Sequence, residues 1–314
     1  MELIRGQHNL RSHHHGCVAT IGNFDGVHLG HQAILRQLAE QGQAFGLPIT
    51  VITFEPQPQE FFAPQAAPAR LMRLREKLLA LRQYGVGRVL CLEFDRRLAA
   101  VPARTFIDTV LVTKLGVRYL IVGDDFRFGR GREGDFELLC QVGRERGFQV
   151  ANTHSYSYDG QRVSSTRIRE ALARGELTLA EGLLGHPYSI CGRVAQGDKR
   201  GRTLGFPTAN IHLHWRSTPL AGVYAVRMRG VGPEPVAGVA NLGRRPTVGG
   251  LRVQLEVHLF DFQQDIYGRH VQVEFLAFLR PEQRFDSLDA LQRQIQTDSD
   301  QARAFLSDPM RRSG

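Results

Sequence analysis

The sequence predicts an α/β domain with a doubly wound parallel sheet, followed by a small antiparallel β-barrel that carries a terminal helix. Two patterns predict this combination. In the first half of the chain, short β-branched runs alternate with amphipathic helical stretches, whereas in the second half strand follows strand between Gly, Pro and Asp turns. Gly185-His186-Pro187 breaks a helical stretch over 169–184, so we expect domains at 1–185 and 186–314.

The first half contains five expected strands, which are largely apolar runs: Cys17–Ile21, Ile49–Phe54, 88–93, 119–123 and Gln149–Thr153. Between them, apolar residues recur at helical spacing over 31–41 and 70–84, and Pro102 opens a third helix. Such strands are typical of a parallel sheet that is covered on both faces, and these sheets bind ligands at the carboxyl ends of their strands. Functional residues are therefore expected just after Ile21, Phe54 and Gly123.

The second half contains alternating strands at 188–194, 222–228, 236–242, 253–260 and 271–279, and a final helix over 287–306. The connection over 201–210 joins the first two of these strands. This order of elements predicts the barrel and the helix packed on it.

Composition limits the class of protein. Of 314 residues, 42% are apolar and 23% are charged, which excludes a disordered chain. The net charge of +9 favours anionic partners, whether nucleotides, nucleic acid or acidic lipid, but arginine is spread along the chain and forms no basic tail.

The cysteines and the apolar runs indicate a cytoplasmic protein. No CxxC pair occurs, and the four cysteines are far apart, so we interpret them as reduced thiols: Cys17, Cys91, Cys140 and Cys191. No stretch approaches the roughly 18 apolar residues of a membrane span, and no leader-like segment follows Met1. We therefore expect no membrane partner.

The segment from Gly22 to His31 is the strongest candidate for a phosphate site. A strand is expected to end at Ile21 and a helix to begin near Gly30, where backbone N–H groups and the helix dipole attract anions. His28 and His31 are three positions apart, so both imidazoles can face one phosphate, and Gly30 lets the ligand approach the backbone. The same loop supplies further expected nucleotide contacts: Gly22, Asn23, Phe24 and Asp25.

HxGH after a strand is typical of nucleotidyl transferases that split ATP between its α and β phosphates. A zinc pair or surface histidines at a helix cap are the alternatives. Zinc needs a third protein ligand, and no Cys or carboxylate recurs nearby at a suitable spacing.

Three further segments support a nucleotide and a flat ring as ligands. Segment 163–169 places hydroxyls at a helix start with two guanidinium groups, which favours an anion, although an ordinary capping motif is the alternative: Ser164, Ser165, Thr166, Arg167 and Arg169. After the fourth strand, Asp124 and Asp125 can accept hydrogen bonds from a nucleoside, and Phe126 and Phe128 can pack a ring. After the second strand, Phe54, Pro56 and Pro58 offer an apolar wall.

A second candidate site lies in the barrel half. The segment Gly201–Asn210 is not a Walker motif, but its Gly201, Arg202 and Gly205 can wrap phosphates. Thr208 and Asn210 lie on one side of an extended segment, where their oxygens can meet Mg²⁺ and ATP. On strand 253–260, Glu256 shares a polar face with Gln254 and His258 and can take a proton from an attacking hydroxyl. A structural turn and a solvent-facing glutamate are the alternatives.

These motifs, in this order, resemble the bacterial bifunctional riboflavin kinase/FAD synthetases. The resemblance rests on Gly22-Asn-Phe-Asp-Gly-Val-His-Leu-Gly-His31, Phe54-Glu-Pro-Gln-Pro58, Gly123-Asp-Asp-Phe-Arg-Phe-Gly129 and Ser164-Ser-Thr-Arg-Ile-Arg169, and on Gly205-Phe-Pro-Thr-Ala-Asn210 and Leu255-Glu-Val-His-Leu-Phe260 in the barrel half. It departs from the family pattern at Gln57, Met72, Gln196 and Gln263-Gln264.

The resemblance implies an enzyme that phosphorylates riboflavin to FMN and transfers an adenylyl group from ATP to FMN, giving FAD and pyrophosphate. It implies that Thr208 and Asn210 bind Mg-ATP and that Glu256 is the catalytic base. The residues expected to bind flavin are Phe54, Pro56, Pro58, Phe62, Phe126, Phe128 and Arg245. The expected partners are these small molecules alone, without nucleic acid, membrane or an obligate protein.

Two other classes of protein share features with the chain. An aminoacyl-tRNA synthetase fragment would also carry HxGH, but its Lys-rich KMSKS loop is missing from the sequence. A flavin- or RNA-binding module without catalysis would fit the positive charge. The aromatic residues, 8% of the chain, do not alternate with arginine as a stacking platform would.

Overall fold

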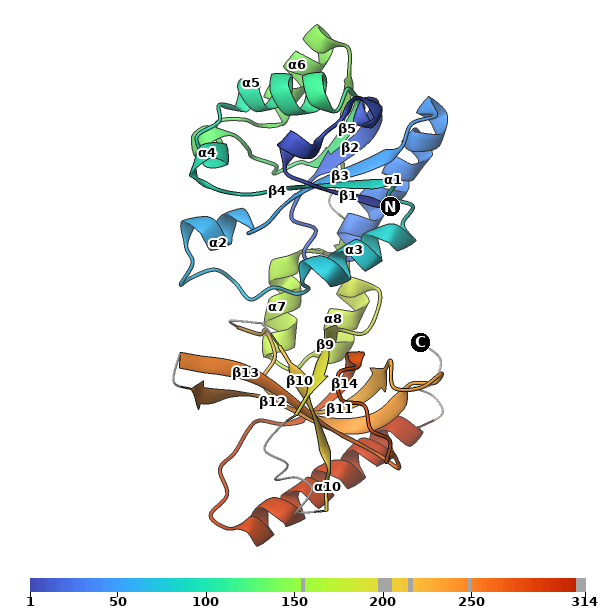
Figure 1. Cartoon of the computed structure of the whole chain (residues 1–314), viewed down its shortest axis with the longest axis vertical. Helices are drawn as coiled ribbons and strands as arrows, with labels where there is room; N and C mark the ends of the chain where they lie inside the picture. The colour runs from blue at the N-terminus through green and yellow to red at the C-terminus, as the bar shows by residue number, and fades with distance from the viewer. Residues whose placement is uncertain (154–155, 197–204, 214–216, 248–249, 309–314) are drawn as a thin grey trace. The chain divides into compact units, whose positions relative to one another are not determined.

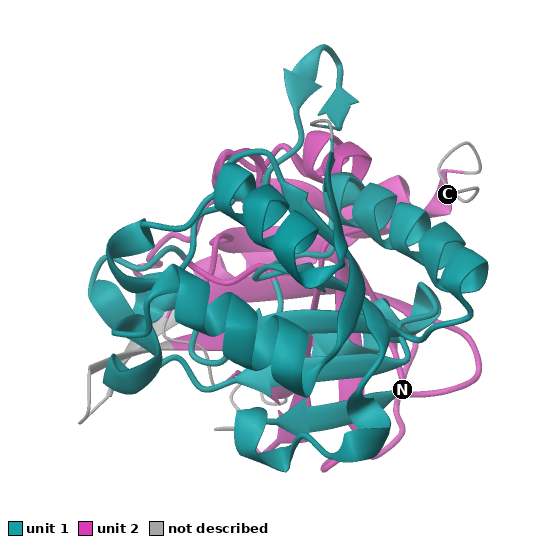
Figure 2. Ribbon diagram, turned by 90° about the horizontal axis from the view of Figure 1, so that it is seen from above, with its two compact units in different colours: residues 1–68, 72–164 teal, residues 69–71, 165–314 magenta. Residues whose placement is uncertain are grey.

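A computed structural model describes residues 1–153, 156–196, 205–213, 217–247 and 250–308 (Figure 1). Within strands, it describes only the backbone of residues 244–247 and 250–252. The chain divides into two compact units, the first formed by residues 1–68 and 72–164 and the second by residues 69–71 and 165–314 (Figure 2). The domain boundary expected near residue 186 stays a prediction.

Unit 1 is built on a six-stranded sheet with the order β1-β4-β3-β2-β5-β6, in which every neighbouring pair is parallel. Its strands are β1 (Glu2–Arg5), β2 (Cys17–Ile21), β3 (Ile49–Phe54), β4 (Arg88–Leu92), β5 (Val117–Gly123) and β6 (Gln149–Thr153). Along β2, Cys17, Ala19 and Ile21 belong to one apolar cluster and Val18 to another, so the strand is buried on both faces. The doubly wound parallel sheet is confirmed.

Helices cover both faces of this sheet. On one face, α1 (Leu29–Phe45) and α3 (Leu74–Gln83) contribute Leu35, Leu38 and Leu81 to the core. On the other, α5 (Ala103–Phe106), the π-helix Ile107–Lys114 and α6 (Phe136–Arg146) contribute Ile107 and Leu139. The shorter elements are α2 (Pro58–Phe62), α4 (Arg96–Ala99), three 3₁₀ turns (Gln7–Asn9, Ser12–His14 and Arg130–Arg132) and the hairpin β7 (Ser157–Tyr158) and β8 (Gln161–Arg162).

Two helical expectations for the first half need correction. Pro102 is the N-cap of α5, with the extended ψ of 146°, and is not its first helical residue. The stretch expected to be helical over 169–184 forms two helices, α7 (Ser165–Ala173) and α8 (Leu177–Leu184), because Gly175 adopts a φ of +74° between them. Both helices belong to unit 2.

Unit 2 contains a closed barrel with the strand order β10-β13-β12-β11-β14-β9, and its neighbouring strands are antiparallel. The strands are β9 (Ser189–Ala195), β10 (Thr208–His212), β11 (Gly222–Arg229), β12 (Val236–Thr247), β13 (Gly250–Leu259) and β14 (His270–Arg280). Helix α10 (Leu288–Ser307) buries Ala302 and Leu306 against Val223 and Val239 of the barrel. The predicted barrel and terminal helix are confirmed.

Candidate functional site

The loop between β2 and α1 brings the two expected phosphate-binding histidines together. His28 is the N-cap of α1, and its Nδ1 accepts a hydrogen bond from the His31 N–H at 3.4 Å. The two imidazole rings are stacked, with centroids 3.7 Å apart and planes inclined by 18°. The ring of Phe24 lies 4.8 Å from that of His31. The spacing of three residues therefore places both rings at the first turn of the helix.

This loop has an unusual backbone. Phe24 and Val27 both adopt positive φ, 47° and 41°, and both side chains are buried. A positive φ is costly for a β-branched residue and is retained when the surrounding structure enforces it, which is common at ligand sites. Gln32 helps to hold Val27 in this conformation, because its Nε2 donates a hydrogen bond to the Val27 carbonyl at 2.9 Å.

Gly30 has a second role beside the one expected from the sequence. A Cβ at this position would lie 3.2 Å from the His28 ring. Glycine therefore leaves space for the imidazole as well as for a ligand that approaches the helix start.

Burial lowers the pKa of His31 well below its usual range, and the positive charges of His28 and Lys77 add to the effect. The Nδ1 atom of His31 is buried and has no hydrogen-bond partner among the described residues. A buried polar atom without a partner is costly, so it points to a group that binds there. His31 is thus a neutral imidazole at the helix start, where an anion would find donors.

The burial of Lys77 and the hydrogen bond between Asp25 and Met72 were not predicted from the sequence. Lys77 is fully buried on α3, and its position in the stripe Leu74, Lys77, Leu78, Leu81 was the available signal. Asp25, expected to contact a nucleotide, is 3% exposed and accepts a hydrogen bond from the Met72 N–H at 3.2 Å. This bond joins the β2–α1 loop to the segment that precedes α3.

The expected flavin wall is part of a larger aromatic group. Phe54 contacts Phe94 edge-on at 5.7 Å, and Phe94 lies 5.6 Å from both Phe61 and Phe62. Phe62 is 67% exposed, so its ring is available to a ligand. Phe61 and Phe94 were not predicted, although Phe94 follows the end of β4 just as the other candidates follow their strands.

The expected residues after β5 also come together. The Phe126 and Phe128 rings are stacked, with centroids 5.4 Å apart. Asp124 and Asp125 are exposed and face the Arg162 guanidinium, at 3.5 and 3.1 Å. This ion pair joins the end of the sheet to the β7–β8 hairpin.

The segment from Ser164 to Arg169 crosses from one compact unit to the other. Ser164 ends unit 1, and Ser165, Thr166, Arg167 and Arg169 form the start of α7 in unit 2. The Arg169 Nε donates to the Ala69 carbonyl within unit 2. That these residues share a ligand with His28 and His31 stays a prediction.

In unit 2, the expected kinase residues form a row across three strands. Asn210 of β10 is paired with Glu256 of β13, and Glu256 is paired with Asn241 of β12. Gln254 donates from its Nε2 to Asn210 Oδ1 at 2.9 Å and to Glu256 Oε1 at 2.8 Å. Thr208, two residues before Asn210, lies on the same side of β10.

The two faces of β13 differ as the sequence predicted. Val253, Leu255, Val257 and Leu259 are buried, while Gln254, Glu256 and His258 are half-buried on the other face. Asn241 donates from its Nδ2 to Glu282 Oε1 at 3.3 Å, and its Oδ1 is buried without a hydrogen-bond partner among the described residues.

Three expected phosphate and flavin contacts of unit 2 are not tested by side-chain geometry. Gly201 and Arg202 lie outside the described residues, and only the backbone of Arg245 is described, paired with Arg252. Gly205 adopts a φ of +84° with open space around it, which suits a loop that surrounds a ligand.

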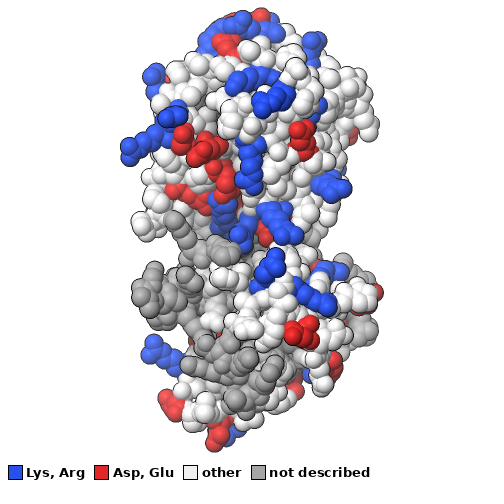
Figure 3. Space-filling model, viewed as in Figure 1, with Lys and Arg blue, Asp and Glu red and all other residues white. Residues whose placement is uncertain are grey.

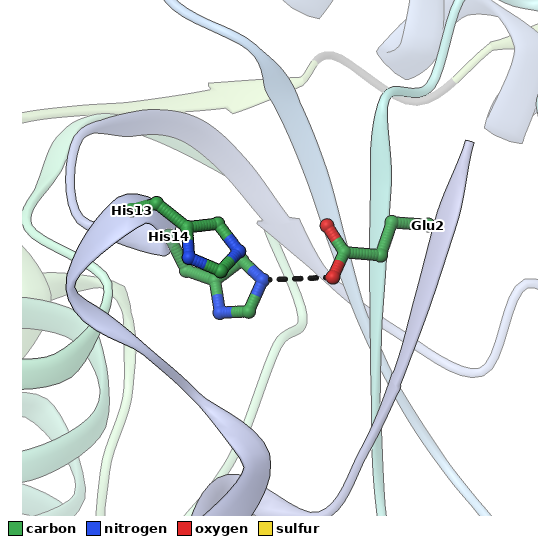
Figure 4. Close-up of side chains that lie close together, drawn as sticks. All are labelled: Glu2, His13 and His14. Atoms are coloured by element: carbon green, nitrogen blue, oxygen red, sulfur yellow. Dashed lines mark hydrogen bonds and ion pairs between the residues drawn. The ribbon is translucent and has the colours of Figure 1, made fainter.

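Glu2, His13 and His14 are close enough to suggest a metal site (Figure 4). However, His14 Nδ1 accepts a hydrogen bond from the Arg11 N–H at 2.8 Å, and its Nε2 lies 2.9 Å from Glu2 Oε1. Because a neutral imidazole carries one proton, Nε2 must be the donor to Glu2, which leaves no lone pair for a metal. We interpret this group as a structural hydrogen-bond network.

On the face drawn in Figure 3, Lys and Arg side chains are interspersed with Asp and Glu and do not gather in one basic patch. Within the part of the chain that the structure describes, no helix is both long and apolar enough to cross a membrane.

Comparisons with known proteins identify the family of the chain. The sequence model of the FAD synthetase family matches residues 10–167, and that of the riboflavin kinase family matches residues 184–306. The bifunctional riboflavin kinase/FMN adenylyltransferase of Escherichia coli (strain K12) is 56% identical over 98% of both chains. The protein of the same description from Haemophilus influenzae is 52% identical over 98% of this chain and all of its own.

A crystal structure described as a macrolide-efflux protein from Streptococcus pneumoniae has the same fold over 96% of this chain and 98% of its own, with a TM-score of 0.83 and 31% identity. The description concerns the Streptococcus protein, and the shared property is the fold. The two family matches and the identity over nearly the whole length settle the classification. The chain belongs to the family of bifunctional riboflavin kinase/FMN adenylyltransferases.

Proposed function

We propose that the chain converts riboflavin to FAD in two ATP-dependent steps, with the kinase residues in the barrel and the adenylyltransferase residues in the β2–α1 loop. Family membership supports both activities. The observation that carries the assignment of residues is the pair of separate clusters: stacked His28 and His31 at a helix start, and the polar row that contains Glu256 on β13.

In the adenylyl transfer, the FMN phosphate attacks the α-phosphate of ATP and pyrophosphate leaves. His28, His31 and the backbone N–H groups at the start of α1 would stabilise the charge that develops on the α-phosphate, because oriented donors in a partly buried site need little reorganisation. Gly22, Asn23, Ser164, Thr166 and the Arg167 and Arg169 guanidinium groups are proposed as further phosphate contacts. The aromatic group around Phe54 and Phe62 offers a surface for the flavin ring.

In the kinase step, Glu256 would take the proton of the ribityl hydroxyl as that oxygen attacks the γ-phosphate of ATP, and ADP leaves. Asn210 of β10 is in register with Glu256 of β13, and Thr208 with His258. The Asn210 and Thr208 side chains each carry an oxygen atom, which is the donor type that Mg²⁺ prefers. They would hold Mg-ATP, whose metal neutralises phosphate charge.

We further propose a folding boundary near residue 186 and a cytoplasmic location. The four cysteines are free, and Cys17 and Cys91 are buried, as expected of reduced thiols. Burial also raises the pKa of Cys17 to about 11, which makes it unreactive.

Two point variants test the proposed function. With riboflavin and Mg-ATP, His31→Ala should accumulate FMN with little FAD, because loss of one such donor lowers a rate by about 10²–10³-fold. Glu256→Gln should form little FMN yet convert supplied FMN to FAD, since loss of a general base costs about 10²–10⁴-fold. Chromatography of the products over time measures both. A His31→Ala protein that lost both steps equally would refute the two-site assignment.

A further inference from the structure

We propose that Gln254 is a positioning residue of the kinase site, whose side-chain amide holds Glu256 and Asn210 at a fixed spacing. The proposal rests on the proposed function, because it takes Glu256 as the base and Asn210 as a ligand of Mg-ATP. It starts from the two hydrogen bonds of a single nitrogen, to Asn210 Oδ1 at 2.9 Å and to Glu256 Oε1 at 2.8 Å.

The geometry uses both protons of the amide. A primary amide nitrogen has two N–H bonds that diverge in one plane, so it can bridge two acceptors. Gln254 and Glu256 are two residues apart on β13 and share a face, while Asn210 is the register partner of Glu256 on β10. The amide therefore joins two strands at the place where the proposed base and the proposed ATP ligand meet.

This bridge has a consequence for both partners. A glutamate side chain has three torsions, and a hydrogen bond to one carboxylate oxygen restricts them so that the other oxygen keeps a constant direction. Asn210 Oδ1 is turned toward β13 by the same donor. Catalytic groups need such restraint, because a misplacement of about 1 Å can cost on the order of 10²-fold in rate.

Gln254 contributes little to the barrel core, which makes a purely structural role a poor explanation. The core of β13 comes from its other face, where Leu255 and Val257 are fully buried. Gln254 itself is half-buried on the face of Glu256 and His258. Replacing its amide should therefore disturb the polar row without opening a cavity in the core.

Gln254→Met tests the proposal, because methionine has a similar length and no donor. In the full chain, the kinase kcat should fall about 10- to 100-fold, and Mg-ATP binding measured by calorimetry should weaken. Adenylylation of supplied FMN and the melting temperature should stay as in wild type. Gln254→Glu, which keeps the size but places a second carboxylate beside Glu256, should lose at least as much kinase activity. Gln272→Met is the matched control, since Gln272 bridges β14 to Ser189 of β9.

A double-mutant cycle separates positioning from a structural effect. If Gln254 acts through Glu256, then Gln254→Met should lower the residual kinase rate little further in a Glu256→Gln background. Full additivity of the two losses would overturn the proposal, as would a kinase kcat within about twofold of wild type in Gln254→Met. If instead Glu256→Gln alone kept its kinase rate, the assignment of the base would fail, and this outcome is distinct from a failure at Gln254.

Discussion

His31 shows how the fold prepares a histidine for phosphate chemistry. Its ring contacts the rings of Phe24 and His28, and its Nδ1 is buried. Burial and the neighbouring positive charges lower its pKa, so the imidazole is neutral in the folded chain at neutral pH. A neutral ring still carries one N–H donor, and an arriving phosphate would favour the addition of a second.

The depressed pKa of His31 predicts a pH dependence of stability. In the unfolded chain, histidine takes up a proton near its ordinary pKa of 6.5, whereas folded His31 stays neutral to lower pH. As the pH falls below about 6.5, the unfolded state binds a proton that the folded state does not, so stability is lost by at most about 1.4 kcal/mol per pH unit. The loss would level off below the folded pKa.

His31→Gln should therefore lose less stability than wild type between about pH 7.5 and pH 5.5, because the coupled proton is gone. The melting temperature of unit 1 across this range measures it. The exposed His8→Gln serves as the control within the same unit and should follow wild type. An equally steep decline in His31→Gln and wild type would show that His31 is not a neutral buried group.

At the scale of elements, the bounds of a strand could be predicted best where a single residue pattern dominated its sequence. The strands Cys17–Ile21 and Ile49–Phe54 have the predicted bounds, since each is a short run of apolar and β-branched residues. Gln149–Thr153 also has the predicted bounds, although only Val150 and Ala151 are apolar in it. Strand β1 was missed because only Leu3 and Ile4 are apolar in its four residues, and β10 because Thr208, Asn210 and His212 are polar. Both strands form because they pair with strands that are far away in the sequence, and a local sequence pattern does not reveal such pairing.

As with the fold, only part of the candidate site could be predicted from the sequence. The rule that ligands bind at strand ends located His28, His31 and the aromatic residues, because strand ends are visible in the sequence. It could not locate Lys77, which is buried on α3 and acts electrostatically on His31, or the amide bridge of Gln254, which depends on the register of β10 and β13. Contacts that depend on register or helix packing become visible only in three dimensions.

The first turn of α1 gives a prediction about Gly30→Ala. Alanine normally stabilises a helix by about 1 kcal/mol relative to glycine. Here the new Cβ would lie 3.2 Å from the His28 ring, so the ring must move. We expect little change in the melting temperature and a loss of about 10- to 100-fold in FAD formation from FMN, with riboflavin phosphorylation unchanged.

Glu40→Ala is the control for this variant, because Glu40 is exposed on the same helix. It should leave both activities as they are. Full adenylylation activity in Gly30→Ala would mean that the His28 ring position is not needed for the reaction.

At the scale of the whole molecule, the barrel has a core of its own, but helices α7 and α8 are grouped with it. Tyr224, Leu255, Val257 and Phe275 are almost fully buried and all belong to residues after 186. Helix α8 contacts β14, and Gly175 approaches the Phe278 ring so closely that a Cβ there would lie 3.0 Å away. The two helices therefore add packing to the barrel without completing its core.

This packing predicts how fragments of the chain behave. Fragments 165–314 and 186–314 should both fold, because the barrel closes on itself in each. The longer one should be more stable by on the order of 1.5–3 kcal/mol, the range for fully burying one large apolar side chain, as α8 covers part of β14. Urea denaturation followed by circular dichroism measures this difference.

Both fragments should convert riboflavin to FMN and stop there, since His28 and His31 are absent. The same fragments with Glu256→Gln control for contaminating kinase. A folded 186–314 fragment that failed to phosphorylate riboflavin, beside an active 165–314 fragment, would move the functional boundary from residue 186 to the start of α7.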